Sequence, residues 1–157
     1  MMGGGQTTWK RPELARGLEA DDSFYFRPEK LPIVAAAIAR RSKDIADYPN
    51  PDMAIEVDLS PPQVDRESIY KGLRVAEIWY FDGSEVTIEQ LGEDGNYSIA
   101  NKSQFLPVTP AEIRRWLVEE DSSELTAWCL RLRAWLARIS KRGHRPTDKS
   151  SRRRNRD

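Results

Sequence analysis

The sequence predicts a single α/β domain, in which helices flank a mixed sheet and further helices lie toward the C-terminal end. A length of 157 residues, 39% of them hydrophobic, is enough for one modest core. Segments of strand character, interrupted by helical segments, run up to about residue 100, and two helical segments follow them. This order of elements is the basis of the predicted fold class.

The first half of the chain is expected to contain strands around one helix. Residues 7–9 and 23–26 are β-branched or aromatic and lie between charged or glycine-containing turns, which is typical of short strands. An alanine-rich segment with apolar residues at helical spacing predicts a helix at 32–42. A Pro-Asn-Pro sequence at 49–51 then breaks the chain, and the nearly apolar segment 53–59 follows as a strand.

The second half is expected to supply a hairpin and then the C-terminal helices. Asp82-Gly83 is a typical hairpin turn between two strands. Thr109-Pro110 followed by an early acid is typical of a capped helix start. The expected elements are a helix at 64–73, strands at 77–81, 85–89 and 97–100, a helix beginning after Thr109, and a helix at 123–139.

The formal net charge of zero hides an uneven distribution. Residues 141–157 hold eight Lys/Arg and two Asp, which leaves 17 basic and 23 acidic residues in 1–140. The sequence therefore predicts a folded domain over 1–140 and a basic tail over 141–157 that is disordered by composition. Such a tail binds nucleic acid phosphates non-specifically, or it only increases solubility, and both interpretations stay open.

Several classes of protein are excluded by composition. The longest apolar stretch, 31–39, is far shorter than the roughly 20 residues of a membrane span, and no secretory leader opens the chain. We therefore expect a soluble, cytoplasmic protein without a membrane partner. Cys129 is the single cysteine, so an intramolecular disulfide is impossible, and its place in an apolar helical pattern predicts a buried structural thiol.

Carboxylates within the strand 53–59 are the most informative local feature. Burying Glu56 costs several kcal/mol unless the carboxylate is paired, hydrogen-bonded or bound to a metal. Because strand side chains alternate, Glu56 and Asp58 share one face. If the segment after Asp21 is the neighbouring strand, Asp21 and Glu56 converge on one hard cation such as Mg²⁺. The alternative is that these acids are solvated or form salt bridges.

Four spaced segments resemble a known family. They are Gly17 to Asp21, Pro51 to Ser60, Asp65-Arg66 through Ile69-Tyr70, and Val75 to Trp79. In this order they resemble the Uma-two family of restriction endonucleases, which belongs to the PD-(D/E)xK nuclease superfamily. The resemblance implies a restriction-endonuclease-like mixed sheet flanked by helices over 1–140. It also implies that the family's N-terminal portion is shortened here. The apolar surface left exposed predicts marginal stability, a homodimer, or a true start that lies upstream.

The resemblance assigns roles residue by residue. The first acid falls on Asp21, without the family's proline, and the second falls on Glu56. Asp58 stands where the superfamily has lysine, and Arg66 matches a basic helix position of the family. Mg²⁺ would be held by Asp21, Glu56 and the carbonyl of Val57, with Asp58 as a further ligand or a support for one. Arg66 would bind phosphate, since arginine stays charged and is no general base.

The function that this resemblance implies is magnesium-dependent hydrolysis of DNA phosphodiester bonds. The alternative is a catalytically inactive remnant that acts as a nucleic-acid-binding or assembly module. Structural roles also stay open for individual residues. Arg66 would then pair with Asp65 or Glu67, Asp52 would terminate a turn, and Glu77 would either support the site or serve the fold.

Overall fold

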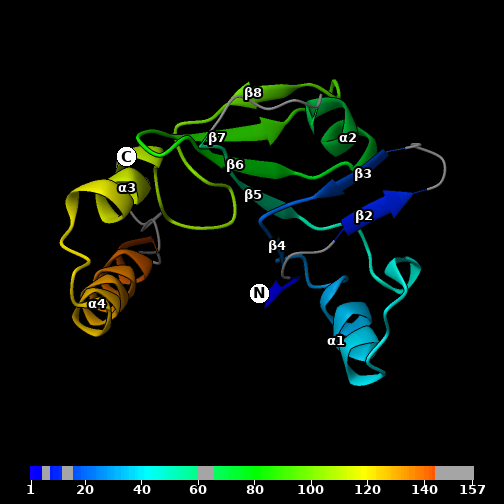
Figure 1. Cartoon of the computed structure of the whole chain (residues 1–157), viewed down its shortest axis with the longest axis horizontal. Helices are drawn as coiled ribbons and strands as arrows, with labels where there is room; N and C mark the ends of the chain where they lie inside the picture. The colour runs from blue at the N-terminus through cyan, green and yellow to red at the C-terminus, as the bar shows by residue number, and fades with distance from the viewer. Residues whose placement is uncertain (5–7, 12–15, 60–65, 144–157) are drawn as a thin grey trace, which may run out of the picture. The chain divides into compact units, whose positions relative to one another are not determined.

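The computed structural model describes residues 1–4, 8–11, 16–59 and 66–143, and the chain forms two compact units, Met1–Glu119 and Glu120–Asp157. The first unit contains a six-stranded sheet in the order β1-β4-β5-β6-β7-β8 (Figure 1). Only β5 and β6 are parallel, and the other neighbours are antiparallel. The strands are β1 Met2–Gly3, β4 Asp22–Tyr25, β5 Met53–Val57, β6 Glu77–Phe81, β7 Val86–Leu91 and β8 Tyr97–Ile99. The predicted mixed sheet of an α/β fold is confirmed.

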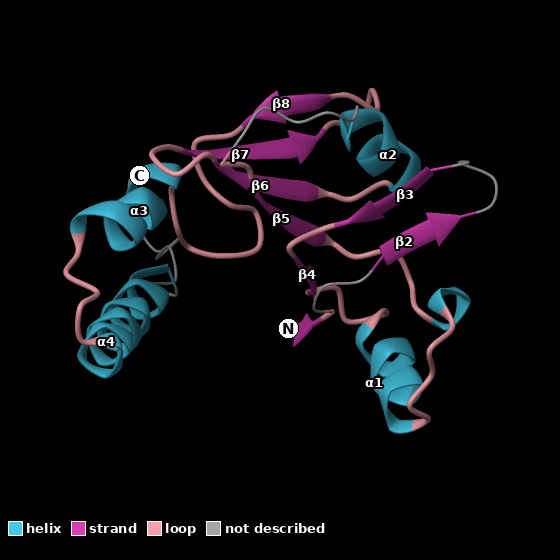
Figure 2. Ribbon diagram, viewed as in Figure 1, coloured by secondary structure: helices cyan, strands magenta, loops and turns pink. Residues whose placement is uncertain are grey.

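Helices connect and cover these strands (Figure 2). The parallel pair β5 and β6 needs a crossover connection, and α2 provides it. A separate antiparallel hairpin, β2 Thr8–Arg11 with β3 Arg16–Glu19, precedes β4. The helices of this unit are α1 Leu31–Ala39, the 3-10 turn η2 Ile45–Asp47, α2 Arg66–Leu73, α3 Pro110–Arg114 and the π-helical turn η3 Arg115–Glu119.

The main hydrophobic core lies on the sheet face that α1 and α2 cover. Its members come from both helices and from the central strands, with Tyr70 and Val34 fully buried. The cluster is Ala20, Tyr25, Val34, Ala54, Ile69, Tyr70, Leu73, Val75 and Ile78. On the other face, α3 lies beside β7, and Trp116 is buried. The sheet is therefore covered by apolar side chains on both faces, which leaves the strand ends as the positions for a functional site.

The second unit contains α4, Leu125–Gly143. Helical spacing predicts one apolar face for this helix, and four of its residues are half-buried: Trp128, Leu132, Trp135 and Ile139. Leu125 and Leu136, which the same spacing places on that face, are exposed. Cys129 is exposed, so the prediction of a buried thiol is wrong. A step of about 100° per residue turns Cys129 away from the face that carries Trp128. In the described residues, no helix combines the length and apolarity needed to cross a membrane.

The observed bounds of several strands differ from the predicted ones. The strand expected at 7–9 is observed from Thr8, and residue 7 lies outside the described residues. The strand expected at 53–59 ends at Val57, because β6 ends opposite it at Phe81. Strand β3 was not expected, since Arg16–Glu19 contains two charged residues and a glycine.

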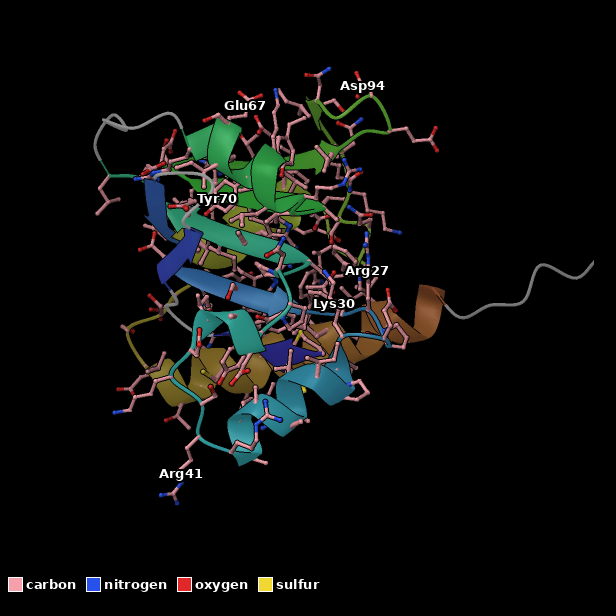
Figure 3. The ribbon with its side chains drawn as sticks, turned by 90° about the vertical axis from the view of Figure 1, so that its right-hand side faces the viewer. Arg27, Lys30, Arg41, Glu67, Tyr70 and Asp94 are labelled. Carbon is pink, nitrogen blue, oxygen red and sulfur yellow. The ribbon has the colours of Figure 1, made fainter. Side chains whose placement is uncertain are left out.

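Arg41 gives a test of backbone strain. It follows α1 with φ of 53°, in the left-handed region that favours glycine, and its side chain points into solvent (Figure 3). We expect Arg41→Gly to raise the free energy of unfolding by up to about 1 kcal/mol, since it removes the Cβ clash. Arg41→Ala keeps the Cβ and should give no such gain in urea denaturation. Equal gains in both variants would contradict this explanation.

Candidate functional site

The pairing of β4 with β5 brings Asp21 beside Glu56. Asp22, the first residue of β4, is paired with Ile55 in this antiparallel register. Asp21, which precedes β4, therefore lies level with Glu56. The Asp21 carboxylate accepts a hydrogen bond from the backbone N–H of Val57 at 2.7 Å. Two acids that are distant in the sequence therefore meet at the carboxyl end of β5.

Glu56 is the centre of the site. Its side chain is 2% exposed, and both of its oxygens are engaged. The hydroxyl of Tyr70 donates to Oε1, and Arg66 Nη1 donates to Oε2 at 2.8 Å. The same Arg66 nitrogen also donates to Asp58 Oδ1 at 2.6 Å. Arg66 thus joins Glu56 on β5 to Asp58, which directly follows the strand.

Helix α2 supplies both partners of Glu56 because of its direction and periodicity. The chain leaves β5 and returns along the sheet as α2, so the first turn of the helix lies near the end of β5. Arg66 and Tyr70 are four residues apart and therefore project from the same face. Figure 3 shows Tyr70 on the side of α2 that faces the strands. Tyr70 is fully buried, so its hydroxyl is held in place by the core.

The electrostatics of the site follow from burial and crowding. Burial raises the pKa of Glu56, and the neighbouring charges of Asp21 and Asp58 add to this rise. The Tyr70 hydrogen bond and the Arg66 charge oppose the rise without cancelling it. Burial also raises the pKa of Tyr70, as does its bond to Glu56, so this hydroxyl stays a hydrogen-bond donor.

The chemistry of the donor set suits a hard divalent cation. With three carboxylates and one guanidinium ionised, the cluster carries two negative charges in excess, and oxygen ligands are those Mg²⁺ prefers. As the side chains stand, no three acidic, His or Cys side chains among the described residues are grouped to hold a metal. Arg66 lies between Glu56 and Asp58 and supplies the positive charge that they need. A cation would therefore compete with Arg66.

Two other positions suggested by the sequence resemblance serve the fold. Asp52 is fully buried and accepts hydrogen bonds from the backbone N–H groups of Phe26 and Arg27, at 2.8 and 2.9 Å. It also accepts one from Lys30 Nζ at 2.5 Å, so it fixes the turn after β4. Its pKa is lowered, because these hydrogen bonds outweigh the opposing effect of burial.

Glu77 is separated from Glu56 by the sheet. Glu77 is paired with Met53 and Glu56 with Tyr80, and an odd spacing along a strand puts the two acids on opposite faces. Glu77 is fully buried and accepts hydrogen bonds from neutral donors: Trp79 Nε1, Gln90 Nε2, Ser103 Oγ and Gln104 N. Of the two roles considered for Glu77, the geometry favours the structural one.

The ion pairs on α2 bear on the structural role that was considered for Arg66. Glu67 forms its ion pair with Lys71 at 2.7 Å, not with Arg66. Asp65, the other proposed partner of Arg66, lies outside the described residues. Tyr70 was missed as a site residue, although its spacing of four from Arg66 was a usable signal.

Tyr70→Phe tests how far the hydroxyl stabilises the buried carboxylate. The variant leaves Glu56 Oε1 without its donor, which we expect to lower the free energy of unfolding by about 1–3 kcal/mol. The pKa of Glu56 should rise further, because one of the effects that lowers it is gone. Tyr97→Phe is the matched control, since it removes a hydroxyl that donates to the Val75 carbonyl at 2.6 Å. It should leave the Glu56 pKa unchanged in a carboxyl NMR titration, and an equal shift in both variants would contradict the assignment.

The raised pKa of Glu56 also sets a pH dependence of stability. Between the unfolded value of 4.5 and the higher folded value, the folded state holds a proton that the unfolded state has released. The stabilisation linked to this proton is fully present below the unfolded pKa and is lost as pH rises through the folded pKa. Glu56→Gln should remove this component from stability profiles measured by urea unfolding across acidic pH. A profile that Glu56→Gln leaves unchanged would show that the pKa shift is absent.

Comparisons with known proteins add no further assignment. No protein-family model matches the sequence, and neither the curated proteins nor the solved structures give a significant match. The resemblance to the Uma-two family therefore stays a prediction based on the sequence segments described above.

Proposed function

We propose that the protein is a magnesium-dependent endodeoxyribonuclease whose active site lies at the carboxyl end of β5. The observation that supports this most is the pairing of Glu56 and Asp58 with one guanidinium, that of Arg66, while Asp21 is held beside Glu56 by the N–H of Val57. Asp21, Glu56 and the Val57 carbonyl would hold the metal. Bound there, Mg²⁺ would acidify a water molecule and neutralise charge on the scissile phosphate.

The protein's own residues would divide the remaining work. The N–H of Val57 holds the Asp21 carboxylate, and the Tyr70 hydroxyl holds one oxygen of Glu56, so both acids are oriented before substrate arrives. Arg66 is 26% exposed in its side chain and can turn from the carboxylates toward a phosphate. It would then stabilise negative charge that develops on the phosphate oxygens.

A second candidate is a catalytically inactive module that binds nucleic acid or assembles with other proteins. The observation that favours it is the double contact of Arg66 with Glu56 and Asp58, which satisfies these carboxylates without a metal. Phosphate binding by the basic residues of 141–157 would then supply the affinity for DNA. Under either candidate function, we propose that the protein is cytoplasmic and forms a homodimer.

Cleavage of supercoiled plasmid DNA separates the two candidates. The nuclease proposal expects nicked and linear products with Mg²⁺ and none with EDTA. The binding-module proposal expects retarded mobility of intact plasmid in a native gel, independent of Mg²⁺ and weakened by salt. Intact plasmid after incubation of folded protein with Mg²⁺ or Mn²⁺ would rule out the nuclease proposal.

A further inference from the structure

A cavity of about 450 Å³ lies at the end of the sheet opposite to Glu56. Asn50 and Ala76, which precede β5 and β6, form part of its wall, whereas Glu56 is near the carboxyl end of β5. Its other walls come from the link between β4 and α1, the end of α2, and the turn after β7. A volume of this size is within the range of pockets that bind small molecules, about 300–1,000 Å³.

Three cationic side chains line this cavity: Arg27, Lys30 and Arg74. Figure 3 shows Arg27 and Lys30 next to each other on the link between β4 and α1. They come from different parts of the chain than Arg74, which follows α2. The fold therefore gathers positive charge here that the sequence leaves dispersed.

Buried Asp52 holds two of these cations in place. Lys30 Nζ donates to Asp52 Oδ1 at 2.5 Å and to the Asn50 carbonyl at 2.8 Å, which leaves one of its three N–H groups for another acceptor. Arg27 Nε lies 3.5 Å from the same Asp52 oxygen, and the Arg27 side chain is 47% exposed. Because Asp52 is fully buried, the exposed donors of Lys30 and Arg27 are what the cavity presents to a ligand.

Arg74 is the third cation and has two unusual properties. In the part of the chain that the structure describes, its guanidinium makes no hydrogen bond or ion pair. Its φ is 52°, in the left-handed region where glycine is the usual residue after a helix. A non-glycine residue there costs about 1–2 kcal/mol, a cost that Arg41 shares, so it is its position in the cavity wall that distinguishes Arg74.

We propose that this cavity binds the phosphate group of a small phosphorylated molecule. Arg27, Lys30 and Arg74 would donate to its oxygens, and the Asn50 and Gln104 amides line the space left for the rest of the ligand. Glu93 also lines the cavity and limits the affinity, because it repels the same anion. This proposal is independent of the nuclease proposal, since it needs neither Mg²⁺ nor Glu56.

Calorimetric titration of the full-length protein with inorganic phosphate and with ribose 5-phosphate, in EDTA, tests this inference. We expect saturable binding of both, tighter for ribose 5-phosphate because it fills more of the cavity. Arg74→Gly should weaken binding by at least about 10-fold, through loss of one charged donor, while it relieves backbone strain and keeps the fold. Glu93→Gln should tighten binding.

Arg41→Gly is the matched control. It removes the same side chain from an equivalent left-handed position after α1, and Arg41 does not line the cavity. Its phosphate affinity should equal that of the wild type. No binding by folded wild-type protein would overturn the proposal. Equal weakening in Arg74→Gly and Arg41→Gly would also overturn it, as would displacement of both probes by duplex DNA.

Discussion

Glu56→Gln is expected to lower magnesium-dependent DNA cleavage by at least about 100-fold, which is the upper range for losing a residue that merely supports metal ligands. Glutamine keeps the shape of the side chain and an oxygen that accepts from Tyr70, and Arg66 retains its bond to Asp58. It removes the negative charge that would attract a cation. The variant should therefore fold and fail in metal-dependent chemistry, which initial rates of plasmid nicking measure.

Glu67→Gln is the control for this experiment. It makes the same chemical change on α2, at a side chain that is 52% exposed and pairs with Lys71. Its cleavage rate should match that of the wild type within about two-fold, since surface charges away from a site have small effects. Equal cleavage by Glu56→Gln and wild-type protein would remove Glu56 from the proposed active site.

Glu77→Ala is expected to lower the free energy of unfolding by about 3 kcal/mol or more, the largest stability effect we predict. Alanine would leave Trp79 Nε1, Ser103 Oγ and the Gln104 N–H without the acceptor that each uses inside the protein. Ser103 is buried, and an unsatisfied buried donor costs about 1–3 kcal/mol, to which the two partly buried donors add. Urea denaturation monitored by tryptophan fluorescence measures the change.

Glu77→Gln shows whether the acceptor or the shape is what matters. Glutamine fills the same space and keeps one oxygen acceptor, but its amide nitrogen is a donor facing other donors. Its destabilisation should therefore lie between those of the wild type and Glu77→Ala. Wild-type stability in Glu77→Ala would mean that the segment 103–104 is not anchored through this carboxylate.

Much of the fold was predictable because local signals agree with tertiary structure. The Thr109 capping box is present, with the Thr109 side chain and Glu112 bonding each other's backbone. The hairpin predicted at Asp82-Gly83 is present, as a four-residue connection over 82–85 in which Gly83 has a φ of 94°. Cys129 was misplaced because an apolar residue beside a helix stripe is indistinguishable from a member of it without the packing partner.

The candidate site was predictable only in part. Alternation along β5 places Glu56 and Asp58 on one face, and the family resemblance selected Asp21 and Arg66. The ion pairs of Arg66 with both carboxylates depend on where α2 returns over the sheet, and no local pattern encodes that position. The cavity lined by Arg27, Lys30 and Arg74 was not foreseen for the same reason, since the packing of separate segments brings these residues to it.

We propose that the carboxylates at the end of β5 bind a divalent cation in competition with Arg66. Calorimetric titration of Mg²⁺ into wild-type protein, Glu56→Gln and Arg66→Ala tests it most directly. We predict saturable binding to the wild type, loss of binding in Glu56→Gln, and tighter binding in Arg66→Ala, because the competing guanidinium is gone. Equal binding in Glu56→Gln and wild type, or no binding in folded Arg66→Ala, would contradict this prediction.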